Sequence, residues 1–591
     1  MSNNLSFPEI NDYVNNHKGE GLSNLRIVIL RNIMVETIEN YLKYLALKNG
    51  FSASVNFGNY DNIIQDAIAE NGIFSAPTDY VLIFTKLEHL SPNLTYSFTQ
   101  QTLEQLEFEK QSVFTFIDIT IKAIREKTDA MIAWHCFEHP LYPAFGIMDV
   151  SSNTMQTAVI DELNNYLRSR LSKEKSAYLV NLNLCISRIG ASNFYDQRYW
   201  HLGKAPYSLF AVEQIAAENF KLIRAQRGKN RKCIVLDCDN TLWGGVIGED
   251  GLNGIKLGNE FPGSAFKELQ CEIVTLYHRG IVLALCSKNN EADVWDVFEN
   301  HPGMVLKKEH IATSRINWCD KAQNIESIAR ELNIGLDSLV FVDDSEFEIN
   351  LVKQILPEVE VIHLPKNKAF SYREIIASCG LFDTLSFTEE DRKRGQMYKA
   401  EAERSKLKKN SGQNISQFLQ SLEMKVEINM ANYDTISRVS QLTQKTNQFN
   451  LTTKRYSEAE IEKFTNSSDM SVLYVNLRDR FGDMGIIGVA IVKCFSYNCE
   501  IDTFLLSCRA LGRGIDSVLL NACITLTKNK GREHLLGQYF ITTKNGQVSD
   551  FFLKEGFECI FNDGSSSKYS FEMLRVERKS PEYFKEILVN I

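Results

Sequence analysis

CIVLDCDNT, residues 233–241, is the stretch that decides the fold in the middle of this chain. Its apolar and partly β-branched start predicts a buried strand, and Asp237 and Asp239 follow where that strand ends. Side chains two residues apart on a strand share a face, so both carboxylates can meet one ligand. Because open parallel sheets bind ligands beyond the carboxyl ends of their strands, the stretch predicts a ligand site in an α/β sheet.

Two further apolar stretches also end in polar residues. IVLALC precedes Ser287, SLVFV precedes Asp343 and Asp344, and Lys321 begins a segment with a helical pattern between them. The carboxyl ends of neighbouring parallel strands lie at the same edge of a sheet. We therefore expect these side chains to gather around the ligand of Asp237.

The order Asp-x-Asp, Ser, Lys, Asp-Asp resembles that of the haloacid dehalogenase superfamily of phosphohydrolases and phosphotransferases. The resemblance implies that Asp237 attacks phosphorus and forms an aspartyl phosphate, and that Asp239 protonates the leaving group and then activates water. It also implies Mg²⁺, which would screen the repulsion between the carboxylate and the phosphoryl oxygens. On this pattern the metal ligands are Asp237, Asp239, Asp343 and Asp344, and the groups that hold the phosphoryl group are Thr241, Ser287 and Lys321.

The intervals between the motif residues limit what covers the site. Neither the interval from Thr241 to Ser287 nor the one from Ser287 to Lys321 has room for a separate lid domain. The segment WGGVIGEDGLNGIKLGNEFPG can supply a short flap, because its glycines allow tight turns. A site without a large cap is accessible to a substrate presented on a protein arm.

The resemblance narrows to the FkbH-like branch of the superfamily on the segments LDCDNTLWGGVIGEDG, LCSKNN and VFVDDSEFE. Three later segments also look like that family: LTQKTNQFNLTTKRY, RDRFGDMGIIGVA and LLSCRALGRGI. The resemblance therefore extends over about residues 20–580. The family is associated with taking a glyceryl unit from 1,3-bisphosphoglycerate, removing both phosphates and placing the unit as a thioester on an acyl carrier protein. The resemblance therefore implies a Mg²⁺-dependent phosphatase and glyceryl transferase in polyketide or related biosynthesis.

The C-terminal part contains a second motif. Arg509, Gly512 and Gly514 form an RxxGxG pattern between a strand-like and a helix-like segment, which fits the acyl-CoA pyrophosphate loop of GNAT-type acetyltransferases. Glycines let backbone N–H groups and a helix N-terminus approach phosphate. An acyl carrier protein has the same phosphopantetheine arm as CoA, so this loop is a candidate reader of a carrier.

A thiol relay for the acyl group has two candidates. Cys286 precedes Ser287 and Lys288 at a strand end, and Cys508 precedes Arg509 at the expected phosphate loop. A cationic neighbour or a helix N-terminus lowers the pKa of a thiol. Both cysteines are equally compatible with small apolar core residues, so the relay, and the choice between the two, stay open.

The first part of the chain alternates β-rich runs such as LRIVIL and YVLIF with helical patterns, which predicts a parallel α/β sheet. The resemblance suggests an SGNH-hydrolase-like fold, but Asn32 falls near the place of the nucleophilic Ser and no GDS triplet is present. Asp196 and His201 also lack the DxxH spacing. We expect a docking domain that is not hydrolytic. Arg198, Trp200 and Lys204 are candidate partner contacts, although packing and surface roles are the favoured interpretation of these residues.

The predicted fold class is thus a multidomain α/β protein. It comprises an SGNH-like domain over residues 1–228, a haloacid-dehalogenase-like domain without a large cap over 229–385, a charged helical connector over 386–412 and a GNAT-like domain over 413–591. The connector has charges of both signs, which favours a solvated helix over a nucleic-acid arm.

Composition limits the remaining classes. The 591 residues are 44% hydrophobic and 24% charged, as in ordinary globular proteins, and a net charge of −9 argues against general nucleic-acid or membrane binding. The 13 cysteines show no CxxC or other zinc spacing, and neither a signal sequence nor an apolar run of about 18 residues occurs, so we expect a cytoplasmic enzyme. Two other hypotheses stay open: a phosphatase for a free phosphorylated metabolite and a non-catalytic acyl-CoA or carrier-binding scaffold. The oligomeric state is also open.

Overall fold

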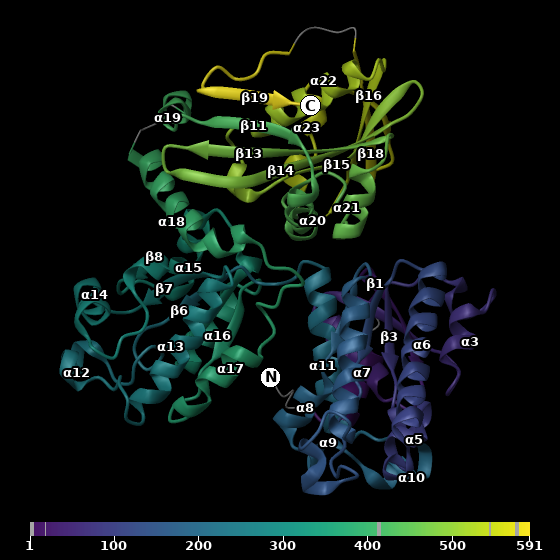
Figure 1. The fold of residues 1–591 in the computed structure, drawn as a ribbon. Coiled ribbons are helices and arrows are strands. Elements are labelled where there is room, and N and C mark those ends of the chain that lie inside the picture. Colours follow the sequence, from purple (N-terminus) through teal and green to yellow (C-terminus); the bar gives the residue numbers. More distant parts are fainter. Residues whose placement is uncertain (1–4, 18, 411–414, 543–544, 574–577) are drawn as a thin grey trace. The chain divides into compact units, whose positions relative to one another are not determined.

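The computed structural model describes residues 5–17, 19–410, 415–542, 545–573 and 578–591, without the side chains of residues 389, 396, 402, 405–410, 415 and 508. Contacts divide the chain into two compact units, Ser2–Ile223 and Arg224–Ile591. The first unit contains one sheet and the second contains two (Figure 1). The chain is therefore a multidomain α/β protein with parallel-sheet domains, as the sequence predicts, while the boundaries at 228, 385 and 412 stay predictions.

The first unit is built on five strands: β1 (Ser23–Arg31), β2 (Phe51–Phe57), β3 (Tyr80–Phe84), β4 (Met131–His135) and β5 (Ala177–Val180). All neighbours pair in parallel in the order β2-β1-β3-β4-β5. β3 and β4 are buried along their whole length, as apolar runs are in parallel sheets covered on both faces. The longer helices of the unit are α1 (Phe7–Asn16), α2 (Ile38–Lys48), α6 (Leu103–Lys127), α7 (Gln156–Ser172), α8 (Leu182–Ile189) and α11 (Leu209–Gln226).

The second unit begins with another parallel sheet, made of β6 (Cys233–Leu236), β7 (Val282–Ser287), β8 (Ile311–Ile316), β9 (Leu339–Asp343) and β10 (Glu360–His363). Its order is β10-β9-β6-β7-β8. Successive strand residues enter two separate apolar clusters, one on each face of the sheet. The helices that follow these strands are α12 (Ile247–Gly254), α13 (Gly263–His278), α14 (Glu291–Asn300), α15 (Lys321–Leu332), α16 (Glu346–Ile355) and α17 (Tyr372–Ser378). Only α12 and α13 lie between β6 and β7, so no large cap is inserted there.

The C-terminal sheet is mixed. Its strands are β11 (Lys425–Met430), β12 (Phe449–Asn450), β13 (Met470–Asp479), β14 (Gly482–Cys494), β15 (Asn498–Leu506), β16 (His534–Phe540), β17 (Glu558–Asn562), β18 (Ser566–Glu572) and β19 (Glu586–Asn590). The main path runs β17-β18-β16-β15-β14-β13-β11-β19, and β12 pairs with β15. β15 and β16 are parallel, as are β11 and β19, whereas the other pairs are antiparallel. The helices beside it are α19 (Ile415–Ser421), α20 (Ile436–Lys445), α21 (Glu458–Thr465), α22 (Ile515–Asn529) and α23 (Phe551–Lys554).

One long helix, α18 (Glu389–Asn410), lies in the predicted charged connector. It is packed rather than solvated, because Asp391, Glu401 and Arg404 are buried. Arg394 Nη1 donates a hydrogen bond to the Gly280 carbonyl at 3.3 Å. A Cβ atom at Gly395 would lie only 2.4 Å from the ring of Tyr277, so this mid-helix position requires glycine. The charge pattern does not reveal this burial because partners such as Gly280 and Asp479 come from distant parts of the chain.

No helix in the part of the chain that the structure describes is both long enough and apolar enough to cross a membrane.

Candidate active site

Three carboxylates meet where β6 and β9 end. Asp237 follows β6, Asp343 ends β9 and Asp344 comes directly after it, and the two strands are paired neighbours. One ligand oxygen of each residue lies within 4.8 Å of those of the other two, and all three residues are buried. The structure thus brings together three of the four predicted metal ligands.

Lys321 lies among these carboxylates. It is the first residue of α15, whose N-cap Asp320 accepts hydrogen bonds from the backbone of the first turn. Its Nζ lies 2.8 Å from Asp237 Oδ1 and 2.6 Å from Asp343 Oδ2. Burial alone would lower the pKa of Lys321, but the two carboxylates outweigh it and raise that pKa. Burial and the charge of Asp237 raise the pKa of Asp343, and Lys321 partly offsets the rise.

The donor set fits Mg²⁺. The three buried carboxylates have one buried ammonium group beside two of them, which leaves an excess of negative charge. Carboxylate oxygens are the ligands that this hard cation prefers. Lys366 adds little, since its Nζ is 3.7 Å from Asp344 Oδ2 and its side chain is 68% exposed. Asp237, Asp343 and Asp344 would hold the ion.

Asp239 lies outside this group of three, although the sequence places it among the metal ligands. Its Oδ1 accepts hydrogen bonds from Trp243 Nε1 at 2.9 Å and from the Ile247 backbone at 3.1 Å. Its Oδ2 accepts one from Asn289 Nδ2 at 3.0 Å. Burial raises the pKa of Asp239, and these hydrogen bonds partly offset the rise. Its side chain is therefore held in one orientation, as an acid-base group requires.

Asn289 is a site residue that sequence reasoning missed. Its Nδ2 also donates to Ser287 Oγ at 3.1 Å, so one amide joins the side chain of Asp239 to that of Ser287. The segment LCSKNN is part of the motif, but the role of its first asparagine depends on the conformation of the turn after β7. Burial of a polar amide in this turn is the feature that identifies it.

Two buried oxygens near the motif have no hydrogen-bond partner among the described residues: Thr241 Oγ1 and Glu348 Oε2. Buried polar atoms in native proteins normally have partners, so an orphaned hydroxyl in a motif residue indicates a ligand contact. Thr241 is fully buried, which agrees with its predicted role toward a phosphoryl group. The other oxygen of Glu348 accepts from Lys288 Nζ at 2.6 Å, so Glu348 supports the site from α16 rather than joining the carboxylate group.

The structure describes only one of the two candidate thiols for the acyl relay. Cys286 belongs to the apolar cluster on one face of its sheet, and it is fully buried. Its thiol donates a long hydrogen bond to the Lys321 carbonyl at 3.8 Å. Burial raises the pKa of this thiol. Both observations argue against a thiolate relay at Cys286. The side chain of Cys508 lies outside the described residues.

The predicted phosphate loop lies between β15 and α22, where the sequence places it. Gly514 is the N-cap of α22 with a φ of 71°, and a Cβ there would lie 2.1 Å from the Tyr583 hydroxyl. Gly512 also has a positive φ of 70°, but open space surrounds the position of its missing Cβ. Arg509 is buried and directs its guanidinium toward Met397 of α18.

The residues of the first unit that the sequence analysis considers make structural contacts or lie at the surface. Asn32, directly after β1, exchanges two hydrogen bonds with the backbone of Lys86, at 2.7 and 3.0 Å. Asp196 caps the short helix α10 (Gln197–Gly203) by accepting from the Tyr199 backbone. This capping role of Asp196 suits the predicted absence of hydrolysis, which stays a prediction. Arg198 and Lys204 are exposed.

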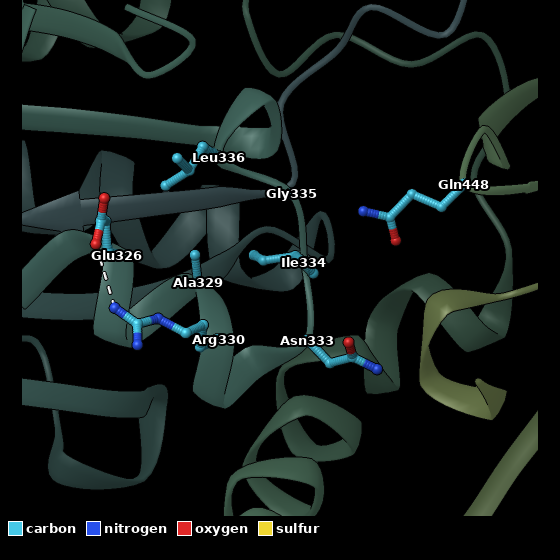
Figure 2. A pocket seen from close by; sticks show the side chains of 8 residues that line it. All are labelled: Glu326, Ala329, Arg330, Asn333, Ile334, Gly335, Leu336 and Gln448. Carbon is cyan, nitrogen blue, oxygen red and sulfur yellow. Dashed lines mark hydrogen bonds and ion pairs between the residues drawn. The ribbon is translucent and has the colours of Figure 1, made fainter. Parts of the chain in front are cut away.

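A pocket of about 510 Å³ lies at the end of α15 and is shown in Figure 2. Its lining includes the exposed ion pair of Glu326 and Arg330, at 3.2 Å, and Gln448 from the C-terminal part. None of its lining residues belongs to the carboxylate group. The chemistry of the carboxylate group, not this pocket, therefore identifies the candidate active site.

Comparison with solved structures identifies a similar phosphatase domain. The chain is similar to the crystal structure of the N-terminal part of the protein BF1531 from Bacteroides fragilis, which contains a phosphatase domain complexed with Mg. The identity is 28% and the TM-score 0.59, over 65% of this chain and 100% of that one.

Two GNAT structures are similar to about a quarter of the chain. The GNAT domain of S. lividans PAT has 14% identity and a TM-score of 0.21, over 24% of this chain and 89% of its own. An acetyl-CoA-bound GNAT family acetyltransferase from Elizabethkingia anophelis has 17% identity and a TM-score of 0.19, over 25% and 98%. These low TM-scores carry no argument about function. No protein-family model and no curated protein matches the sequence.

Proposed function

We propose that this chain is a Mg²⁺-dependent phosphohydrolase of the haloacid dehalogenase type. The observation that carries the proposal is the buried group of Asp237, Asp343 and Asp344 with Lys321 between two of its members. The similarity to a solved phosphatase domain complexed with Mg supports it. A scaffold has no need of three buried carboxylates grouped in this way, which argues against the non-catalytic alternative.

In this proposal each step of phosphate-ester hydrolysis is assigned to residues of the chain. Asp237 attacks phosphorus with a carboxylate oxygen, and the bond to the leaving-group oxygen breaks. Asp239 gives its proton to that oxygen and then takes one from the water that hydrolyses the aspartyl phosphate. Lys321 holds Asp237 in place, and Thr241 and Ser287 hold the phosphoryl oxygens. When bound by the three carboxylates, Mg²⁺ supplies positive charge that offsets the repulsion between the nucleophile and the phosphoryl group.

We further propose the FkbH-like activity: removal of both phosphates of 1,3-bisphosphoglycerate and transfer of the glyceryl unit to an acyl carrier protein. An acyl phosphate is already activated, so a thiolate can attack its carbonyl carbon and expel phosphate. The second phosphate is an ester, and its removal requires the chemistry of Asp237. The absence of a large cap between β6 and β7 supports a substrate presented on a protein.

The test of the phosphatase is phosphate release from a phosphomonoester by the full chain with Mg²⁺. We expect release by the wild type and loss in Asp237→Asn, with Asp250→Asn as a matched control on the flap. Release that persists in Asp237→Asn would remove the proposed nucleophile.

The test of glyceryl transfer is mass spectrometry of a holo carrier protein after incubation with the enzyme, Mg²⁺ and 1,3-bisphosphoglycerate. We expect a mass gain equal to one glyceryl group. No gain, together with normal phosphate release, would leave the alternative of a phosphatase for a free metabolite.

Docking of the carrier has its own test, because acyl carrier proteins are usually acidic and this chain has a net charge of −9. A local basic surface would have to compensate for that repulsion. The candidates are Arg198 and Lys204 of the first unit and the stretch from Arg392 to Lys409, whose side chains at 396, 402 and 405–409 lie outside the described residues. Substituting Arg198 and Lys204 together should slow carrier loading but leave phosphate release unchanged.

A further inference from the structure

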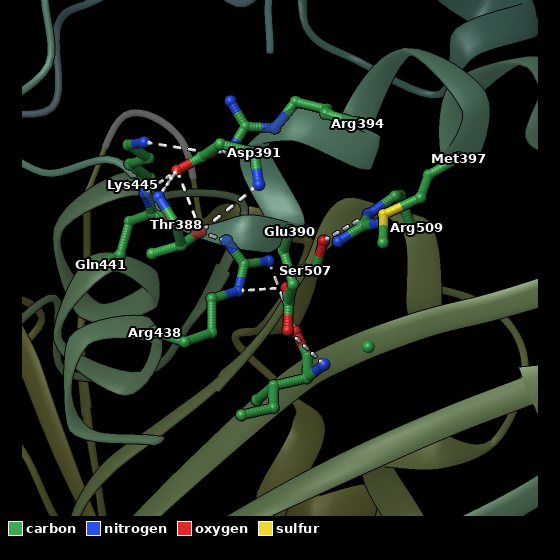
Figure 3. A network of polar contacts seen from close by, with 12 residues as sticks. Thr388, Glu390, Asp391, Arg394, Met397, Arg438, Gln441, Lys445, Ser507 and Arg509 are labelled. Atoms are coloured by element: carbon green, nitrogen blue, oxygen red, sulfur yellow. Dashed lines mark hydrogen bonds and ion pairs between the residues drawn. The ribbon is translucent and has the colours of Figure 1, made fainter. Parts of the chain in front are cut away.

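Charged side chains gather around the first turns of α18, as Figure 3 shows. Glu390 Oε2 lies 2.6 Å from Arg438 Nε, and Asp391 forms an ion pair with Arg394. The first of these contacts joins α18 to α20, so the group contributes to the packing of the long helix. Thiol chemistry lies elsewhere in the second unit, in the hairpin of β14 and β15.

Two cysteines lie opposite each other in this hairpin. Cys494 ends β14, and the antiparallel register pairs it with Cys499, the second residue of β15. Residues 495–498 separate them in the sequence, so they form no CxxC motif. The strand register, rather than sequence spacing, brings the two residues together.

The backbone hydrogen bonds show that this is a close pair. Opposite residues of an antiparallel sheet alternate between hydrogen-bonded and non-hydrogen-bonded pairs, and side chains are closer in the latter. Phe495 donates its backbone N–H to the Asn498 carbonyl at 2.8 Å. Cys494 donates its own to the Asp469 carbonyl, on the side of β13, at 2.7 Å. Cys494 and Cys499 therefore form a non-hydrogen-bonded pair, in which Cα atoms lie about 4.5 Å apart, within the span of a disulfide.

Both side chains lie on the same face of the sheet. Cys499 is fully buried in the apolar cluster on that face, and Cys494 packs against the cluster while remaining partly exposed. The tip of the hairpin is open to solvent, since Phe495 is 42% and Tyr497 81% exposed. A reagent from solution therefore reaches Cys494 before Cys499.

The surroundings also make the two thiols unequal. A hydrogen bond from the Cys499 thiol lowers the pKa of Cys494 against the effect of burial, and the charges of Lys530 and Arg532, which follow α22, lower it further. The same hydrogen bond and burial raise the pKa of Cys499. Because the thiolate is the nucleophile, Cys494 is suited to attack and Cys499 to react second.

Cys559 provides a contrast. It is exposed on β17, and the register with β18 places Tyr569 opposite it. Its Sγ donates a hydrogen bond to the Phe561 carbonyl at 3.4 Å. Cys559 is therefore accessible to a thiol reagent but has no thiol opposite it in the register.

We propose that Cys494 and Cys499 form a redox-active dithiol that small-molecule disulfides oxidise to an intrachain disulfide. The thiolate of Cys494 attacks one sulfur of the reagent, whose S–S bond breaks to release one thiolate. Cys499 then loses its proton and attacks the sulfur of Cys494, which releases the other half of the reagent as a thiol. Two electrons pass from the protein to the reagent, and an excess of reducing thiol reverses both steps. This site is separate from the carboxylate group and does not depend on the proposed function.

The test treats the folded full chain with oxidised glutathione, blocks the remaining thiols and digests the unfolded product with chymotrypsin. Cleavage after Phe495 and Tyr497 separates the two cysteines, so only a disulfide keeps their peptides together, and cleavage after Phe504 removes Cys508. We expect a cross-linked species that is lighter than the two free peptides by two hydrogen atoms and that a reducing agent separates. Glutathione that stays on Cys494 without a cross-link would overturn the proposal.

The matched variants are Cys499→Ala, which should lose the cross-link and keep glutathione on Cys494, and Cys559→Ala, which should keep the cross-link. A second readout needs no variant, because phenylarsine oxide binds two thiols that lie close together. It should protect Cys494 and Cys499 of the wild type from alkylation, while Cys559 stays reactive. Equal alkylation of Cys494 with and without the arsenical would contradict the pairing.

Discussion

Removing the Lys321 ammonium group is the sharpest perturbation of the candidate active site. In Lys321→Met, two buried carboxylates, Asp237 and Asp343, lose the group that lies 2.8 and 2.6 Å from them. Breaking a buried ion pair by removing one partner costs about 3–5 kcal/mol, because the remaining charge stays buried without compensation. We expect a loss of that size in the free energy of unfolding and a fall in kcat of about 100-fold or more.

Lys366→Met is the matched control, since it removes the same charge from a lysine beside the third carboxylate, Asp344. Its Nζ is 3.7 Å from Asp344 and its side chain is largely exposed, so solvent screening limits the expected loss to about 1 kcal/mol or less. The assay is urea unfolding of both variants in EDTA near neutral pH, followed by tryptophan fluorescence. Equal losses in the two variants would refute the assignment of Lys321 as the buried counter-charge.

Three further predictions concern single side chains. Burial lowers the pKa of His135 to about 4 from an ordinary 6.5. Between these two pH values the unfolded chain takes up a proton on this residue that the native chain does not. About 3 kcal/mol of stability should therefore be lost as the pH falls from 6.5 to 4. Acid unfolding monitored by circular dichroism should show this slope, with no change in it for the exposed control His201→Gln and a smaller slope for His135→Gln. Asn289→Ala should lower kcat on the order of 10- to 100-fold with little change in KM, because Asp239 and Ser287 lose their common partner. The neighbouring Asn290→Ala should leave kcat unchanged. Equal kinetics for the two variants would contradict the positioning role of Asn289. Cys286→Ala should keep both phosphate release and carrier loading, as measured by mass spectrometry, and a loss of loading alone would assign the relay to Cys286.

Four strands of each parallel sheet could be predicted from the sequence because they are short apolar runs. The other two, β2 with FSASVNF and β8 with IATSRI, could not, because polar residues interrupt their apolar pattern. The same rule placed Asp237, Asp343 and Lys321 in one group, since the carboxyl ends of β6 and β9 lie at one edge of the sheet. The apolar runs also identified β15 and α22 on either side of the RxxGxG loop, with Gly514 as the helix N-cap.

The contacts that could not be predicted depend on loop conformation or on distant partners. Asn289 reaches Asp239 only through the shape of the turn after β7. The burial of α18 depends on partners such as Asp479 and Arg438, which lie far along the chain, so a charged segment was expected to be solvated. The pairing of β19 with β11 likewise joins strands that a local pattern does not connect.

The contact between Gly395 and the ring of Tyr277 has a consequence for protein engineering. Glycine inside a helix is normally the first residue to replace, since alanine raises the stability of an isolated helix by about 1 kcal/mol. Here the added methyl group would collide with an aromatic ring, and relief of that collision would move α18 away from the carbonyl of Gly280. A substitution chosen to strengthen this helix would therefore weaken the protein, and a library designed on helix propensity alone would select the wrong residue at this position.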